Sequence, residues 1–189
     1  MTGYGRMVEA MNNGTLRGKW KTGVFCMLLA GLLLIQYMDT AAVVHAAPPK
    51  TVAAIQISAG YALNAMEQKA VLLLNADRRN AGLEPLKVNQ NLSKLAADYA
   101  GDMNARKFFA HIDPDGRDPF DRMATIGVDF PNAGENIALC QDVETAHKML
   151  MDSPLHRENI LNPKFTEIGI GTKTDARGGV YLVQEFIGP

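Results

Sequence analysis

Residues 168–186, IGIGTKTDARGGVYLVQEF, decide the fold class. Larger side chains alternate with smaller or polar ones over residues 168–173, which is typical of a strand with one buried face. The turn-forming residues 175–179 (DARGG) separate this stretch from a second apolar strand over residues 180–186. The pattern predicts a β-hairpin. The two glycines of its first strand predict that a neighbouring element approaches that strand closely.

The residues before this hairpin have mostly helical patterns. Apolar residues recur at helical spacing in residues 67–80, which end shortly before Gly82, and again in residues 89–107. Shorter helices are predicted over residues 118–123 and 142–152 and from Ser153-Pro154 onward. Residues 133–139 are predicted to be a short extended piece. Helices around a small antiparallel sheet make an α+β architecture.

The N-terminal residues are typical of a secretory signal peptide. The basic stretch KWK at residues 19–21 precedes a 14-residue apolar run over residues 22–35, and small residues follow up to Ala46. These are the parts of a signal peptide. The run is shorter than the roughly 20 residues that span a bilayer. We therefore expect cleavage after Ala46, with an uncleaved N-terminal anchor as the alternative.

The chain divides into three parts. Residues 1–46 form the leader, whose length makes Met7 or Met11 alternative starts, residues 47–66 are expected to be a linker, and residues 67–189 the domain.

The charge balance argues against a nucleic-acid-binding protein, and the cysteine content argues against a domain held by disulfides. The chain has 19 basic and 20 acidic residues; four and two of these precede Ala47, which leaves 15 basic and 18 acidic residues. A domain with this balance has no basic surface for nucleic acid, so we expect no nucleic-acid partner. Cys26 lies in the apolar run, so Cys140 is alone after cleavage and the domain depends on its core rather than on disulfides.

Two histidines and one glutamate are the main candidates for chemistry. His111 stands where a helix gives way to a Pro-Asp-Gly turn, His156 in the first turn of a helix, and Glu135 between glycine and asparagine. Two imidazoles and a carboxylate are ligands that zinc favours, and they could also serve as general acid and base. The alternative is that all three have structural roles, since they are far apart in sequence and no HExxH or CxxC pattern is present.

Three further patterns favour structural roles. The acidic residues of the turn 113–118 do not match the positions of an EF-hand, which favours a solvated turn. Ser153 precedes Pro154 and is expected to cap a helix rather than to act as a nucleophile with His156. Cys140 has no glycine-flanked nucleophile context and is expected to be a buried or half-buried thiol.

Five segments carry a recognisable pattern: residues 71–103 (VLLLNADRRNAGLEPLKVNQNLSKLAADYAGDM), 108–123 (FFAHIDPDGRDPFDRM), 134–138 (GENIA), 153–171 (SPLHRENILNPKFTEIGIG) and 181–186 (YLVQEF). In this order they resemble the bacterial SCP-like branch of the CAP superfamily. That superfamily also includes cysteine-rich secretory proteins, insect venom antigens and plant pathogenesis-related proteins. The resemblance extends from about residue 67 to residue 188, and the order of the segments makes it specific.

The resemblance implies a three-layer α-β-α sandwich with a small antiparallel sheet and a large cleft on one side. In that family the cleft holds two histidines and one or two acidic residues, which in some members bind a divalent cation, often zinc. By motif, the corresponding residues here are His111, Glu135 and His156. They are the expected metal ligands and also the candidate catalytic residues.

The sequence departs from the family pattern near the second histidine. Many eukaryotic relatives have a second glutamate just before it, where this chain has Asp152 as an additional candidate ligand. Leu150 replaces a common bulky aromatic residue, and Leu155 replaces the more usual glycine. These departures concern the expected metal site and not the fold.

The resemblance implies several roles, from binding of sterols, lipids or cell-wall components to proteolysis. We expect a secreted or envelope-associated binding domain, not a conventional enzyme, whose cleft can hold a divalent cation such as zinc. No nucleophile or set of oxyanion donors can be named. The expected partner is a cell-wall, lipid or peptide ligand, and membrane contact is expected only through the N-terminal segment.

Two alternatives remain. One is a metal-assisted hydrolase of peptides or cell-wall polymer, in which Glu135 removes a proton from a metal-bound water. The other is a stable module that recruits its partner through a different surface.

Overall fold

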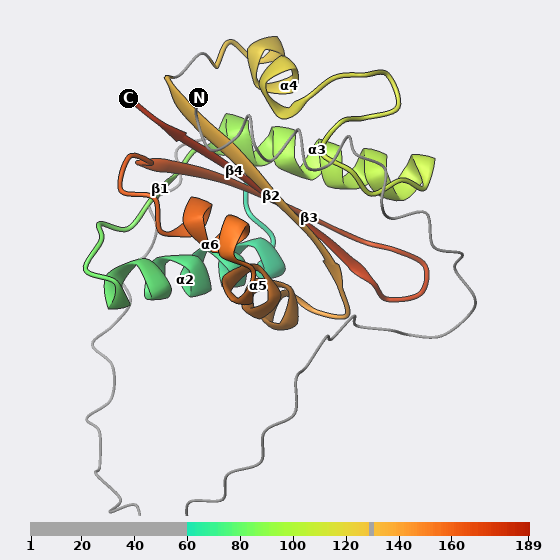
Figure 1. Ribbon diagram of the computed structural model, residues 1–189. Coiled ribbons are helices and arrows are strands. Elements are labelled where there is room, and N and C mark those ends of the chain that lie inside the picture. The colour runs from blue at the N-terminus through green and yellow to red at the C-terminus, as the bar shows by residue number, and fades with distance from the viewer. Residues whose placement is uncertain (1–59, 129–130) are drawn as a thin grey trace, which may run out of the picture.

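The computed structural model describes residues 60–128 and 131–189 (Figure 1). The expected leader and residues 47–59 of the expected linker lie outside the described residues. Within the described part, no helix is both long enough and apolar enough to cross a bilayer.

The order of elements confirms the helices and the C-terminal hairpin that the sequence predicts. Predicted and observed helix boundaries differ by no more than a few residues. The elements are α2 (Ala65–Asn80), β1 (Lys87–Val88), α3 (Gln90–Arg106), α4 (Pro119–Thr125), β2 (Asn132–Cys140), α5 (Val143–Asp152), α6 (Pro154–Ile160), β3 (Glu167–Thr174) and β4 (Val180–Gly188).

The four strands form one sheet in the order β1-β3-β4-β2. The β3–β4 and β2–β4 pairs are antiparallel, whereas β1 is parallel to β3, so the sheet is mixed and not wholly antiparallel as expected. β2 has nine residues and is an edge strand. The sequence predicted only a short extended piece there, because buried polar residues interrupt its apolar pattern.

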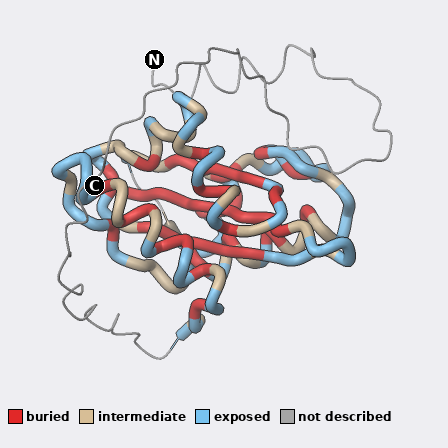
Figure 2. Tube along the Cα trace, turned by 90° about the horizontal axis from the view of Figure 1, so that it is seen from below, coloured by how far each residue is buried: buried red, intermediate tan, exposed pale blue. Residues whose placement is uncertain are grey.

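Helices cover both faces of the sheet. α3 and α4 lie on one side, and α2, α5 and α6 lie on the other (Figure 1). The strands between them are buried along most of their length (Figure 2). Side chains alternate along β4: Leu182 and Phe186 join the core beneath α2 and α5, while Tyr181 and Val183 pack against α3. The arrangement confirms an α+β fold with three layers.

Two glycines of β3 allow α3 to lie directly on the sheet. A Cβ atom on Gly171 would lie 2.0 Å from the backbone nitrogen of Ala97, and one on Gly169 would lie 2.4 Å from the backbone carbon of Leu92. Real Cβ atoms do not come this close to backbone, so only glycine fits. The close approach that the sequence predicts is confirmed.

The folded part begins before residue 67, the expected domain boundary. Asn64 caps α2 by accepting hydrogen bonds from the backbone N–H groups of Met66 and Glu67, while the Glu67 side chain accepts from the Asn64 N–H. This reciprocal capping box starts the helix at Ala65. Leu63 is already buried in the core.

Candidate functional site

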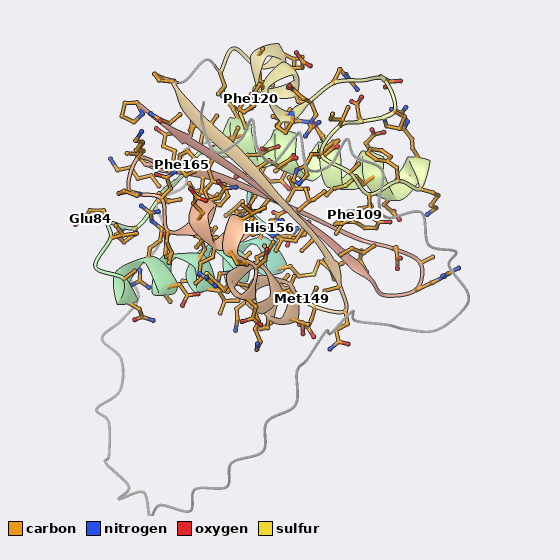
Figure 3. The ribbon with its side chains drawn as sticks, in the orientation of Figure 1. Glu84, Phe109, Phe120, Met149, His156 and Phe165 are labelled. Carbon is orange, nitrogen blue, oxygen red and sulfur yellow. The ribbon has the colours of Figure 1, made fainter. Side chains whose placement is uncertain are left out.

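The three predicted site residues are positioned by different parts of the fold. His111 lies in the loop between α3 and α4, and Glu135 lies on the edge strand β2. His156 lies in the first turn of α6 (Figure 3). His111 and Glu135 are buried, and His156 is half-buried. α4 and α6 both contact β2, so this strand connects the two histidine-bearing segments.

Glu135 is the centre of a buried hydrogen-bond network. Its side chain is fully buried and faces α3, on the same side of the sheet as Ile137. His111 Nδ1 lies 2.6 Å from Glu135 Oε1, and Arg122 Nη2 donates to Oε2 over 2.6 Å. Because a carboxylate only accepts hydrogen bonds, His111 Nδ1 carries the hydrogen and Nε2 is the remaining ring nitrogen.

The loop that carries His111 is fixed at several points. α3 ends at Lys107, whose left-handed backbone (φ 57°) turns the chain away from the helix axis. The Tyr99 hydroxyl donates to the carbonyl of Ala110 over 2.6 Å, and Arg122 Nη1 donates to the carbonyl of His111 over 2.9 Å. The Arg122 guanidinium also stacks on the Tyr99 ring, 3.4 Å from its centroid. These contacts hold the imidazole against Glu135.

His156 makes its own contact in the first turn of α6. Its Nδ1 lies 2.7 Å from Ser153 Oγ, and Asn136 Nδ2 donates to its carbonyl over 3.1 Å. Burial lowers the pKa of His156, and the charge of His111 lowers it further. The two imidazoles are therefore close enough to interact electrostatically.

Ser153 differs from its predicted role. It occupies the N-cap position of α6, but its side chain makes no capping hydrogen bond. The hydroxyl group contacts Nδ1 of His156 instead.

A cluster of amide side chains connects β2 and β4 to α6, the helix that carries His156. Asn136 and Gln184 are direct cross-strand partners, and Asn136 Nδ2 donates to Gln184 Oε1 over 3.1 Å. Asn159 of α6 donates to Asn136 Oδ1 over 2.8 Å and to the carbonyl of Glu135 over 3.3 Å. Glu135 and Asn136 are consecutive residues of β2, so their side chains point to opposite faces of the sheet. The two halves of the site thus meet at the edge strand.

The remaining ring nitrogens are the atoms that could coordinate a cation. His111 Nε2 is buried and has no hydrogen-bond partner among the described residues. On His156, Nδ1 is engaged by Ser153, which leaves Nε2 as the second candidate donor. Within residues 60–128 and 131–189, no group of three or more His, Cys, Asp or Glu side chains has the arrangement of a metal site. Of the predicted site residues, the two histidines are the ones that keep a ring nitrogen, Nε2, for a further contact.

Asp152, the additional candidate ligand, lies at the surface. Its side chain is 65% exposed and accepts a hydrogen bond from Lys148 Nζ over 2.5 Å. The residues are four apart on α5, a spacing that brings helical side chains together. The structure therefore does not bring Asp152 to Glu135 and His111.

Two charged residues of the site were not identified from the sequence. Glu185 of β4 lies directly opposite Glu135 and is equally buried, and Arg122 of α4 binds Glu135. Glu185 has a weak signal in the sequence, since it is a charged residue in the otherwise apolar segment VYLVQEFIG. Arg122 has none, because nothing in its short helix distinguishes it from a surface residue.

The acidic turn after His111 is held by its own hydrogen bonds. Asp113 Oδ1 accepts from the backbone N–H groups of Asp115 and Arg117, and Oδ2 accepts from Arg117 Nε. The structural role is confirmed, but Asp113 itself is buried, not solvated as expected. Cys140 is buried, as expected, and its Sγ lies 3.0 Å from Met149 Sδ.

Comparisons with known proteins agree with the fold. The family model described as "Cysteine-rich secretory protein family" (CAP) matches residues 71–186. The uncharacterized protein YkwD of Bacillus subtilis is 42% identical over 132 residues, which cover 69% of this chain and 50% of YkwD. The chain therefore spans about half the length of this relative.

Two solved structures share the fold. The first is an extracellular protein of Bacillus anthracis that contains an SCP domain; it is 31% identical, with a TM-score of 0.60, over 65% of this chain and 40% of that protein. The second is an outer surface protein of Borrelia burgdorferi that is 20% identical, with a TM-score of 0.60, over 69% of this chain and 99% of that protein. At that identity the second likeness shows the fold alone.

Proposed function

The chain belongs to the cysteine-rich secretory protein (CAP) family, and from this premise we propose that it is an extracellular binding domain whose His111 and His156 imidazoles hold a divalent cation. Imidazole nitrogens suit zinc best among the cations that such sites take. The rest of the coordination shell is left to solvent or to a bound ligand.

The observation that carries this proposal is the state of the two imidazoles. Each has Nδ1 engaged inside the protein, His111 by Glu135 and His156 by Ser153. His111 donates to the carboxylate of Glu135, and the Ser153 hydroxyl can accept from His156 Nδ1 in the same way. A histidine that donates through one nitrogen presents the lone pair of the other, which is how metal-binding histidines are usually held. His111 Nε2 is moreover a buried polar atom with no partner in the described part of the chain. Such an atom calls for an explanation, and a bound ion supplies one.

Glu135 acts on the cation indirectly, through His111. Its two oxygens already bind His111 and Arg122, so it orients His111 and fixes which ring nitrogen carries the hydrogen. We therefore propose His111 and His156 as the ligands and Glu135 as the partner of a ligand. With only two protein ligands, the site is expected to bind zinc more weakly than a four-ligand structural site.

The residues beside both histidines indicate what kind of ligand accompanies the cation. Phe109 and Ile112 flank His111 and are 47% and 41% exposed, and Leu155 precedes His156 and is 52% exposed. Exposed apolar side chains next to polar groups are typical of binding sites. We propose that a cell-wall, lipid or peptide ligand places an apolar part on these residues.

Zinc titration of the purified, chelator-treated protein tests the proposal. Binding at one equivalent is expected in the wild type and should be lost in both H111A and H156A. H147A is the matched control, since His147 is a buried histidine that pairs with Asp77 between α2 and α5. Equal zinc binding by all four proteins would contradict the proposal.

The second candidate function is a metal-assisted hydrolase. In it, Glu135 would remove a proton from a cation-bound water. The geometry supports this less well, because Glu135 is fully buried and both its oxygens are occupied. Turnover of peptides or peptidoglycan with zinc that disappears in H111A and in H156A would favour the enzyme.

An extracellular location is also part of the proposal. One related structure is an extracellular protein and another is an outer surface protein. The signal-peptide pattern of residues 1–46 supports the same location for this chain. Mass spectrometry of the protein recovered from the culture medium should find Ala47 as its first residue. An intact leader on a membrane-bound product would favour the N-terminal anchor instead.

A further inference from the structure

The two edges of the sheet differ in how their backbone groups are satisfied. Beyond the short strand β1, side chains close the outer edge of β3: Ile170 N–H donates to Ser93 Oγ over 3.2 Å, and Thr172 N–H donates to Glu67 Oε1 over 3.0 Å. The opposite edge is β2, and no further strand pairs with it among the described residues. Helices α4 and α6 pack beside this open edge, which therefore runs between the two histidine-bearing segments.

The register identifies the backbone groups that point outward from β2. In an antiparallel pair the N–H and C=O of one residue point to the same side, and successive residues alternate. When this alternation is followed from the two outward-facing residues of β3 across β4, the outward-facing residues of β2 are Glu135, Ile137 and Leu139. Asn159 of α6 agrees with this direction, because its Nδ2 reaches the carbonyl of Glu135 over 3.3 Å.

The outward groups of Ile137 and Leu139 are unpaired. Their backbone N–H and C=O groups make no hydrogen bond with any residue of 60–128 or 131–189. Leu139 is 36% exposed, whereas Ile137 lies deeper between the helical layers. Proteins usually protect an open edge with lysine, proline or a bulge, and residues 137–139 (IAL) have none of these. This edge is therefore able to pair with another strand.

Exposed apolar side chains flank the open edge on both faces of the sheet (Figure 3). On the α3 side, the Phe109 ring lies 6.3 Å from the ring of Tyr181, the cross-strand partner of Leu139. On the other side, Met149 of α5 is 37% exposed and Leu155 of α6 is 52% exposed. The side chains of a strand alternate between the two faces of its sheet. An added strand with apolar residues would place them on both of these surfaces.

We propose that the ligand is a peptide in an extended conformation with apolar side chains, which binds as an additional strand on β2 at residues 137–139. A peptide fits this edge because it repeats N–H and C=O groups at the spacing of a strand, whereas a lipid chain or a glycan does not. The inference names the ligand class of the proposed binding domain and rests on that function. The pairing itself needs no cation.

A capped hexapeptide with alternating apolar residues between two lysines, acetyl-KVLVLK-amide, is the probe, and the metal-free full chain is its target. Amide hydrogen exchange followed by NMR should show that the peptide slows exchange at Ile137 and Leu139. The matched probe is the same peptide with N-methyl groups on its apolar residues, which keeps the side chains but has no central N–H donor. It should bind roughly tenfold more weakly, since backbone hydrogen bonds to the edge are lost.

The variant L139P tests the same contact from the side of the protein. Because the N–H of Leu139 points outward, proline removes it without breaking a bond to β4, and edge strands tolerate proline at such positions. L139V is the matched control, since it keeps the N–H and an apolar side chain. L139P should weaken peptide binding roughly tenfold, and L139V should change it by less than about twofold.

No binding of the hexapeptide, equal binding of its N-methylated form, or protection of amides away from β2 would overturn the inference. These results come from the wild type and do not require a variant to fold. Equal effects of L139P and L139V would also overturn it. Zinc titration of the same protein separates this inference from the proposed function: peptide binding without zinc binding would contradict the cation site alone, and zinc binding without peptide binding would contradict only the strand pairing.

Discussion

Among the described residues, Arg122 is the one lysine or arginine that contacts the Glu135 carboxylate, and both side chains are nearly or fully buried. Removal of one member of a buried ion pair leaves the other charge without a partner, which costs about 3–5 kcal/mol. We predict that R122M lowers the free energy of unfolding by that amount, as measured by chemical denaturation. R79M, at an exposed arginine near the end of α2, should change it by less than about 0.5 kcal/mol. A similar small effect of R122M would contradict the role given to this residue.

Glu185 gives a prediction for the pH dependence of stability. Its folded-state pKa is raised above the ordinary value of 4.5, mainly by burial. The wild type should therefore be most stable, relative to E185Q, below pH 4.5, and should lose this advantage as the pH rises toward the folded pKa. In that window the difference changes by about 1.4 kcal/mol per pH unit. Thermal unfolding at pH 4, 5.5 and 7 measures it, and a wild type that gains on E185Q with rising pH would show that Glu185 is ionised.

Only some of the individual residues of the site could be predicted from the sequence. The motifs identified His111, Glu135 and His156, because each stands in a short segment with its own local signature. Arg122 and Glu185 could not be found in this way, since their roles come from partners 13 and 50 residues distant in sequence. The contact of Ser153 with His156 was likewise missed, because a serine before proline is usually a helix cap.

Among the elements, the contact of α3 with β3 depends on the two glycines. We predict that G171A destabilises the protein by about 3 kcal/mol, since the added methyl group would meet backbone atoms of α3 that cannot move aside easily. G101A is the matched control within α3 itself, where a Cβ would meet nothing within 4 Å. It should stabilise the helix by about 0.5–1 kcal/mol. Equal effects of the two changes on the melting temperature would contradict the close packing.

The sequence predicted the helices and the hairpin better than the rest of the sheet. Amphipathic periodicity and capping residues are local signals, so α2, α3 and α5 were found close to their true bounds. β1 has two residues and exists only through its parallel pairing with β3, which no local pattern indicates. β2 is buried on both faces, and its own buried side chains are polar as well as apolar. It therefore lacks the alternation that identifies a half-buried strand.

At the scale of the whole molecule, residues that belong to opposite faces of the sheet interact electrostatically at its edge strand β2. His111 belongs to the α3–α4 side and His156 to the α6 side. Burial lowers the pKa of His156, and the charge of His111 lowers it further. We predict that H111A raises the pKa of His156 toward the ordinary value of 6.5, as followed by NMR titration of the imidazole. H147A should leave the pKa of His156 unchanged. The same value in all three proteins would mean that the histidines do not interact.

The central claim is that these two imidazoles bind one cation. X-ray absorption of the zinc-loaded protein tests it most directly, since the spectrum reports the atoms that surround the metal. The account predicts imidazole nitrogens at about 2.0–2.1 Å from zinc in the wild type, and loss of that imidazole signal in H111A and in H156A. A shell of oxygen atoms alone, or a spectrum that is the same in all three proteins, would contradict it.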